Sequence, residues 1–152
     1  MSTQLPIVAR VTRRFTHPPE RVFDAWLDPQ QVRRWMAASI PRRKMASTAE
    51  LLRVEIDARV GGTFSFVELR DGEEVEHTGE YLELDRPRRL VFTWAVPKYS
   101  ADRDRVSIDI VPQDTGCELT LLHEMKPEWA EYESRTVAGW TLMIDSIAGT
   151  LG

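Results

Sequence analysis

The sequence has almost no cysteine and no long apolar run, and both shortages restrict what the protein can be. Cys117 is the single cysteine among 152 residues, which excludes an internal disulfide and any metal site built from several cysteines. No apolar run approaches the roughly 18–20 residues that cross a bilayer, so we expect no membrane insertion. The first fifteen residues lack a basic region followed by an apolar core, so we expect a cytoplasmic protein without a secretory signal.

Acidic residues outnumber basic ones. The chain has 20 Lys and Arg against 24 Asp and Glu, and the formal net charge of −4 argues against general nucleic-acid binding. No Gly-rich phosphate loop, Gly-x-Ser-x-Gly elbow or cluster of His, Asp and Glu at metal-ligand spacing is present. His17, His77 and His123 lie far apart on different predicted elements. We therefore expect neither a metal nor a cofactor.

The apolar content is sufficient for a core. A chain of 152 residues, of which 42% are hydrophobic, has the size of one domain. A domain of this size buries about 68–70% of the surface that its unfolded chain exposes. We expect residues 1–152 to form a single globular domain.

The longest helical pattern lies at the end of the chain, over residues 128–152. Pro127 precedes this pattern, and a proline without an N–H suits the first turn of a helix. Apolar residues recur at helical spacing, in a stripe of Val137, Trp140, Met143, Ile144, Ile147 and Leu151. The rest of the chain must supply the surface that buries this stripe.

The first fifty residues predict a strand, two short helices and a loop. Residues 7–16 alternate as a half-buried strand, and prolines then introduce short helices over residues 19–27 and 30–37. Val32, Trp35 and Met36 face inward on the second helix. Residues 39–50 show no period and contain Arg42, Arg43 and Lys44. This segment is either a solvated loop or a flap that faces an anion.

From Leu51 onward the apolar period is two, as in strands. Asp71-Gly72 is a typical hairpin turn, and the short connections predict antiparallel neighbours. The residues predicted to face inward are Leu52, Val54 and Ile56, then Phe64 and Phe66, then Leu90, Phe92 and Trp94, then Val106, Ile108 and Ile110, and finally Cys117, Leu119, Leu121 and His123. The element order predicts an α+β fold with six to seven antiparallel strands. Because a twisted sheet curls, a helix laid across it can leave a cavity.

Several motifs resemble the START-like helix-grip (SRPBCC) superfamily, and within it the branch related to the activator of heat-shock-protein-90 ATPase. They are FTHPPERVFDAW at 15–26 followed by Asp28-Pro29 and Trp35, DARVGG at 57–62, GEYLEL at 79–84 with PRRL at 87–90, and AGW at 138–140. The resemblance implies a curved antiparallel sheet that grips a C-terminal helix, two small helices at one end, and an apolar pocket. Similar proteins bind lipids, hormones or polyketide-like molecules, catalyse cyclisation or hydrolysis, or act on a chaperone. The resemblance also implies a homodimer.

Aromatic residues on the predicted inner face are the candidates for a ligand cavity. The expected lining residues are Trp35, Met36, Phe64, Phe66, Phe92, Trp94, His123, Trp140 and Ile144. The alternative is that the same aromatic rings form an ordinary packed core, and the sequence does not separate the two.

His123 and Glu68 are the candidates for acid–base catalysis. His123 falls at the inner end of a strand, where it could orient a ligand or transfer a proton; the simpler interpretation is a histidine bonded to a backbone carbonyl at the rim. Glu68 is in phase with Phe64 and Phe66, and the simpler interpretation places it beyond the buried part of its strand. Cys117 has apolar neighbours and no nearby basic residue, as expected of an inert buried thiol.

Three functions follow from these observations. The first is a protein that binds a small hydrophobic molecule in a cavity under the terminal helix. The second is a cyclase-type or hydrolase-type enzyme that uses His123 or Glu68 in the same cavity. The third is a protein-interaction module linked to a chaperone, although the second domain of the eukaryotic chaperone activators has no counterpart in this sequence.

Overall fold

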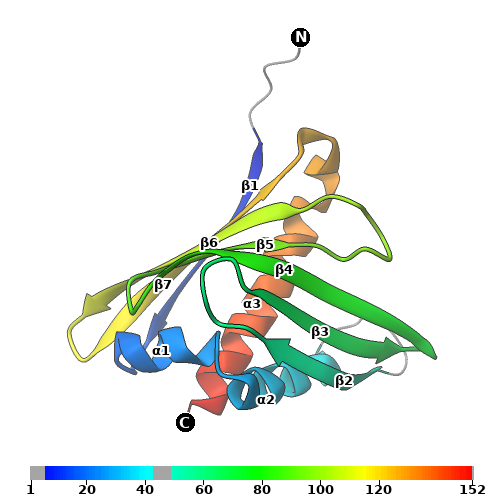
Figure 1. Ribbon diagram of the computed structural model, residues 1–152. Helices are drawn as coiled ribbons and strands as arrows, with labels where there is room; N and C mark the ends of the chain where they lie inside the picture. Colours follow the sequence, from blue (N-terminus) through cyan, green and yellow to red (C-terminus); the bar gives the residue numbers. More distant parts are fainter. Residues whose placement is uncertain (1–5, 43–48, 152) are drawn as a thin grey trace.

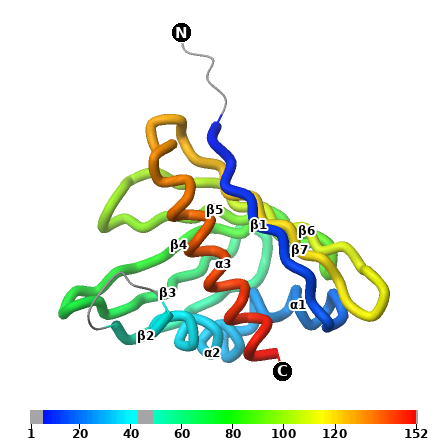
Figure 2. The backbone as a smooth tube through the Cα atoms, turned by 180° about the vertical axis from the view of Figure 1, so that it is seen from behind, coloured from blue at the N-terminus to red at the C-terminus, as the bar shows by residue number. Residues whose placement is uncertain are grey.

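The computed structural model describes residues 6–42 and 49–151. Within these residues one antiparallel sheet of seven strands wraps around a long C-terminal helix, as Figures 1 and 2 show from opposite sides. The strand order is β1-β7-β6-β5-β4-β3-β2. The strands are β1 (Ile7–Phe15), β2 (Ala49–Ile56), β3 (Thr63–Arg70), β4 (Glu73–Asp85), β5 (Arg89–Trp94), β6 (Asp104–Gln113) and β7 (Gly116–Met125). The predicted α+β helix-grip fold is confirmed.

Two short helices close one end of the sheet. They are α1 (Pro19–Ala25) and α2 (Pro29–Ser39), which lie below the strands in Figure 1. Asp28 caps α2, because its Oδ1 accepts a hydrogen bond from the backbone N–H of Gln30 at 2.9 Å. The Trp35 indole N–H donates to the Ala25 carbonyl at 2.8 Å and ties the two helices together. Val32, Trp35 and Met36 are buried, as predicted.

The terminal helix begins later than the sequence predicts. Residues 127–132 form a 3₁₀ segment, η2 (Pro127–Tyr132), and α3 (Glu133–Thr150) follows it. Trp129 has non-helical backbone angles, and its indole N–H donates to Asp102 at 2.8 Å. This tertiary bond overrides the helical pattern of the first turn. The apolar stripe itself is confirmed, since Trp140, Ile144, Ile147 and Leu151 are buried while Val137 and Met143 pack against the core.

β1, the first strand, pairs along its whole length with β7, the last strand. The helix α3 runs beside β1 in the view of Figure 2, and an ion pair of 2.8 Å joins Arg13 on β1 to Asp145 on α3. The Asp71-Gly72 hairpin turn is confirmed, with φ values of 48° and 87° at its two central residues.

The prediction that Leu52 faces inward is wrong. The pairing of β2 with β3 is irregular between Leu51 and Arg53. A bulge puts two residues opposite one and reverses which faces inward, so Leu51 packs against the core and Leu52 is 40% exposed. Val54 is buried as predicted.

The loop predicted at 39–50 is shorter than expected. Ser39 still belongs to α2, a 3₁₀ turn, η1 (Ile40–Arg42), follows it, and β2 begins at Ala49. Arg43 and Lys44 lie outside the described residues, so the function of this basic loop stays a prediction. No helix of the part that the structure describes is long and apolar enough to cross a membrane.

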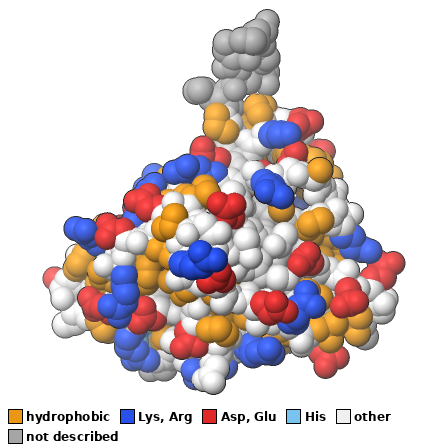
Figure 3. All heavy atoms as spheres, in the orientation of Figure 1, with side chains coloured by type: hydrophobic (Ala, Val, Ile, Leu, Met, Phe, Trp, Pro, Cys, Tyr) orange, Lys and Arg blue, Asp and Glu red, His pale blue; other side chains and the backbone are white. Residues whose placement is uncertain are grey.

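The outer surface mixes both signs of charge. Figure 3 shows acidic and basic side chains intermixed over the face seen in Figure 1. On the side of the sheet away from α3, Arg89 bridges Glu83 at 3.1 Å and Asp109 at 2.8 Å. Such exposed pairs are typical of a solvated surface and contribute little to stability.

Candidate functional site

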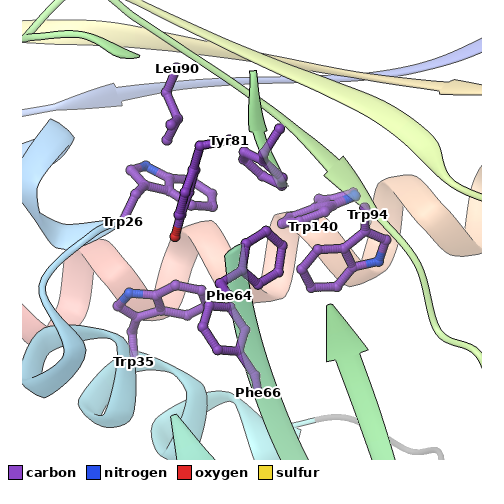
Figure 4. Close-up of a pocket in the computed structure, with 9 residues that line it drawn as sticks. Trp26, Trp35, Phe64, Phe66, Tyr81, Leu90, Trp94 and Trp140 are labelled. Atoms are coloured by element: carbon purple, nitrogen blue, oxygen red, sulfur yellow. The ribbon is translucent and has the colours of Figure 1, made fainter. Parts of the chain in front are cut away.

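The inner face of the sheet and the helices enclose a cluster of aromatic side chains (Figure 4). Phe64 is its centre, with ring centroids 4.9 Å from Phe66, 5.6 Å from Phe92 and 5.9 Å from Trp94. The cavity left inside the cluster has a volume of about 20 Å³, which is room for about one water molecule. The lining residues are Trp26, Trp35, Phe64, Phe66, Tyr81, Leu90, Phe92, Trp94 and Trp140.

Most aromatic residues predicted to line a cavity lie around this small space, but three of the predicted lining residues do not. Met36 and Ile144 are buried in the core without reaching the cavity, and His123 lies at a different, open site. The sequence reading missed Trp26, Tyr81 and Leu90. The signal that could have identified Leu90 is its alternation with Phe92 and Trp94, which places all three side chains on the inner face of their strand.

Tyr81 brings a hydroxyl group into the aromatic cluster. Its ring stands between Trp26 and Phe64, and its hydroxyl points toward the space between Trp26 and Trp35 (Figure 4). Burial raises the pKa of this phenol well above its ordinary value, and the nearby Asp57 carboxylate raises it further. The group therefore stays a neutral hydroxyl at physiological pH.

A much larger space opens beside the N-terminal half of α3. This groove has a volume of about 680 Å³ and lies between the segment after β5, the end of β7, η2 and the first turn of α3. Trp94 lines both the groove and the closed cavity. The groove residues are Trp94, Ala95, Val96, Tyr99, Ser100, Asp102, Asp104, His123, Met125, Trp129, Tyr132, Arg135 and Thr136.

His123 is held at the groove by two side chains. The Trp140 indole N–H donates to His123 Nδ1 at 2.8 Å, so Nδ1 carries no proton. Nε2 is therefore the protonated nitrogen, and it donates to Asp104 Oδ2 at 2.8 Å. A second proton on the ring would turn Nδ1–H against the N–H of Trp140. The two bonds fix the orientation of the His123 ring and the nitrogen that faces each partner.

The simpler interpretation of His123, a bond to a backbone carbonyl, is wrong. The residue is 5% exposed on the inner face, as predicted, but both of its ring nitrogens bind side chains. Asp104 was missed as its partner, although it is in phase with Val106 and Ile108 on β6. The register that pairs Val106 with His123 brings Asp104 to the diagonal position on the same face.

Asp102 forms one wall of the groove. It accepts hydrogen bonds from Lys126 Nζ at 2.7 Å and from the Trp129 indole N–H at 2.8 Å. The bond from Lys126, followed by the one from Trp129, lowers the pKa of this carboxyl below its ordinary value. The charge of Asp102 is therefore matched by a lysine, and the carboxylate orients an aromatic ring of the groove.

The rim of the groove is aromatic. Tyr99 is 62% exposed, and Tyr132 lies against Trp129 with ring centroids 5.5 Å apart. The Arg135 guanidinium carbon lies 5.5 Å from the centroid of the Tyr132 ring, in cation–π contact. The sequence reading missed these residues, because they lie in short irregular segments where no period assigns a face.

Glu68 lies inside the molecule, so its assignment beyond the buried part of β3 is wrong. The side chain is 0% exposed and accepts a hydrogen bond from Arg70 Nε at 3.0 Å. His77 Nε2 lies 3.3 Å from Arg70 Nη2 and 3.7 Å from Glu68 Oε1. The cation of Arg70 explains how a carboxylate is tolerated there, because buried charges are stable only when paired.

Cys117 is buried, as predicted, in the first part of β7. Burial raises the pKa of its thiol, and the charge of Glu20 adds to the effect. Both effects disfavour the reactive thiolate. Among the residues that the structure describes, no group of three or more His, Cys, Asp and Glu side chains is arranged to hold a metal ion.

The sheet around one long helix, with an aromatic groove at the start of that helix, defines a helix-grip domain of the ligand-binding type. Residues 16–152 match the family model described as activator of Hsp90 ATPase homolog 1-like protein. The chain belongs to this family.

Solved structures of bacterial proteins share the fold. Protein CV1439 of Chromobacterium violaceum is 28% identical, with a TM-score of 0.76 over 95% of this chain and 96% of that chain. Protein NE0264 of Nitrosomonas europaea has the same TM-score at 17% identity, over 99% and 96% of the two chains. An AHSA1-like protein of Aeromonas hydrophila is 20% identical, with a TM-score of 0.74 over 93% and 90%. No curated protein sequence matches the chain.

Proposed function

We propose that this protein binds a small, largely apolar molecule in the groove between the sheet and the start of α3. The observation that carries the proposal is the groove itself, about 680 Å³ in volume with four aromatic side chains, Trp94, Tyr99, Trp129 and Tyr132, in its lining. Ligand sites of proteins typically have about 300–1,000 Å³ and combine apolar walls with a few fixed polar groups. The pair of His123 and Asp104 supplies such polar groups.

The closed aromatic cluster is a poorer candidate for the same function. Its cavity of about 20 Å³ admits no molecule larger than water unless side chains move. The sequence predicts a hydrophobic site under the terminal helix. We therefore propose this site in the open groove beside the start of α3 and not in the closed aromatic cluster.

The enzyme hypothesis has less support from the geometry. Both nitrogens of His123 are engaged, and Glu68 is bonded to Arg70 away from the groove lining. A general acid or base needs a proton within reach of its substrate. We therefore propose binding without turnover, while a homodimer, a chaperone partner and a cytoplasmic location stay predictions.

Fluorescence titration with the neutral probe N-phenyl-1-naphthylamine tests the proposal. We expect the wild-type protein to bind the probe with enhanced fluorescence, and the double substitution Tyr99→Ala with Trp129→Ala to weaken binding by about tenfold, because two stacked rings are lost. Leu82→Ala is the matched control, since Leu82 is 39% exposed and lies outside the groove.

Native mass spectrometry of the same proteins completes the test. A molecule that copurifies with the wild type and is lost in the double variant would support the groove as its site. Equal probe affinity in the wild type and the double variant would refute it. The same spectra distinguish a monomer from the predicted dimer.

A further inference from the structure

Asp104 differs from the other charged groups of the groove in having no cationic partner. The carboxylate side chain is 22% exposed, and its ion-pair partner within 4 Å among the described residues is His123. Trp140 donates to His123 Nδ1 and His123 Nε2 bonds to Asp104, so the carboxylate is hydrogen-bonded, but no Lys or Arg pairs with it among the described residues. A partly buried carboxylate in this state attracts a positive charge, because desolvation makes an unmatched charge costly.

Asp102 shows what a matched carboxylate of the same groove looks like. Lys126 Nζ lies 2.7 Å from Asp102 Oδ1. The negative charge of Asp102 is therefore already paired with a cation of the protein. The hydrogen bond and the charge of Asp102 are the largest effects that raise the pKa of Lys126. The two carboxylates of the groove therefore differ in their partners: Asp102 pairs with a lysine, whereas Asp104 bonds to a histidine and has no lysine or arginine partner among the described residues.

The aromatic lining suits a cation as well as an apolar body. Trp94, Tyr99, Trp129 and Tyr132 come from two separated segments and line one groove with Asp104. Arg135 already lies over the Tyr132 ring, so a positive charge is stable against this wall. Aromatic rings beside a carboxylate are the usual surroundings of a bound organic ammonium group.

We propose that the groove selects an organic amine, with the protonated nitrogen at Asp104 and an aromatic or apolar body between the rings. This inference rests on the proposed function and adds the chemical class of the ligand. His123 and Trp140 act as positioning residues, because their hydrogen bonds hold Oδ2 of Asp104 and leave Oδ1 for the ligand. The guanidinium of Arg135 is exposed at the rim, where solvent and salt screen its repulsion of the amine.

Three probes with the same indole ring test the selection at neutral pH. Tryptamine is a cation, tryptophol is neutral and indole-3-acetate is an anion. NMR titrations of ¹⁵N-labelled protein give both the site and the dissociation constant. They follow the backbone N–H signals of Trp94, Tyr99 and Trp129 and the indole N–H signals of the two tryptophans. We expect tryptamine to bind about tenfold more tightly than tryptophol, as a charge-assisted bond allows, and indole-3-acetate to bind most weakly.

Asp104→Asn keeps an oxygen that accepts from His123 and removes the charge. In this variant the affinity for tryptamine is expected to fall to that for tryptophol. Asp109→Asn is the control of equal net charge, because Asp109 binds Arg89 on the other face of the sheet, and it should keep the wild-type order. The dispersed signals of the spectra show whether each variant is folded.

The outcomes separate the inference from the proposed function. Groove signals that shift equally with all three probes in the wild type would overturn the selection of amines and leave binding in the groove intact. Tightest binding of indole-3-acetate, lost on Arg135→Gln, would overturn it in favour of an acid held at the rim. If none of the three probes shifts groove signals at millimolar concentration, the proposed groove function itself is overturned.

Discussion

The closed aromatic cluster and the open groove use the same kind of residue in opposite ways. Both contain rings from the sheet and share Trp94, yet one leaves about 20 Å³ and the other about 680 Å³. In the cluster, rings come from the sheet, from the end of α1, from α2 and from α3, and they leave only the small cavity between them. In the groove, Tyr99 of the segment after β5 is 62% exposed, so much of its ring is open to solvent. Aromatic content alone therefore indicates neither a core nor a site.

The polar groups separate the two regions further. In the cluster, the indole N–H of Trp35 is satisfied by the Ala25 backbone. In the groove, Asp102 and Asp104 bring formal charge to the lining. A packed interior stabilises the fold by removing apolar surface from water, whereas a binding site must keep some polar groups available.

The largest difference between the regions should be in stability. Phe64→Ala removes the central ring of the cluster and should lower the free energy of unfolding by about 3–5 kcal/mol, since the cavity cannot collapse fully. Tyr99→Ala in the groove should change it by no more than about 0.5 kcal/mol. Urea denaturation measures both. A similar loss in the two variants would mean that the groove is part of the core.

Thiol accessibility should separate the same regions. Cys117 in its native position is expected to react with a disulfide reagent at least about a hundredfold more slowly than Tyr99→Cys in a Cys117→Ser background, because the buried thiol reacts only after local opening. Absorbance of the released thiolate measures the rates. Comparable rates in folded protein would show that β7 opens readily and would weaken the contrast.

Trp140→Phe tests the link between the cluster and the groove. The variant keeps an aromatic ring and removes the donor to His123 Nδ1, leaving a buried acceptor without its partner, so we expect a loss of about 1–3 kcal/mol in stability. The ¹⁵N shifts of the His123 ring should also lose the signature of the single Nε2–H tautomer. An unchanged tautomer would show that Asp104 alone fixes the ring.

The smallest expected effect is the response of the groove wall to acid. The pKa of Asp102 is lowered in the folded protein, so its bonds to Lys126 and Trp129 are complete above the ordinary Asp value of about 3.9 and are lost as the pH falls through the lower, folded value. The Trp129 indole N–H signal should stay constant from pH 7 to about 5 and move only below about 4. Asp102→Asn should remove this response. A midpoint near pH 6 would contradict the assignment.

Much of the fold could be predicted because local patterns and the final structure agree. The period of two in β6 and the stripe of α3 report directly which side is buried, and the Asp-Gly pair defines its turn. The prediction was wrong where a local irregularity changes the phase, as at the bulge beside Leu52, and where a distant bond overrides it, as at Trp129. Neither cause is visible in a short stretch of sequence.

The candidate site was harder to predict than the fold. His123 was placed on the inner face correctly, but its partners come from another strand and from the terminal helix. Asp104 had a signal, its phase with Val106, although it follows a polar stretch that is typical of a loop. The sequence has no such signal for Tyr99 and Tyr132. Both lie in short irregular segments, where no regular spacing of apolar residues indicates which side chains face the protein.

The sequence by itself determined the order of the elements, the buried stripe of α3 and the family, since each depends on residue spacing along the chain. Only the tertiary structure decided which space is filled and which is open, and which carboxylate lacks a cation. These properties depend on distances between residues far apart in sequence. Such distances are set by strand register and by side-chain packing, where a shift of one residue moves a side chain to the opposite face of the sheet.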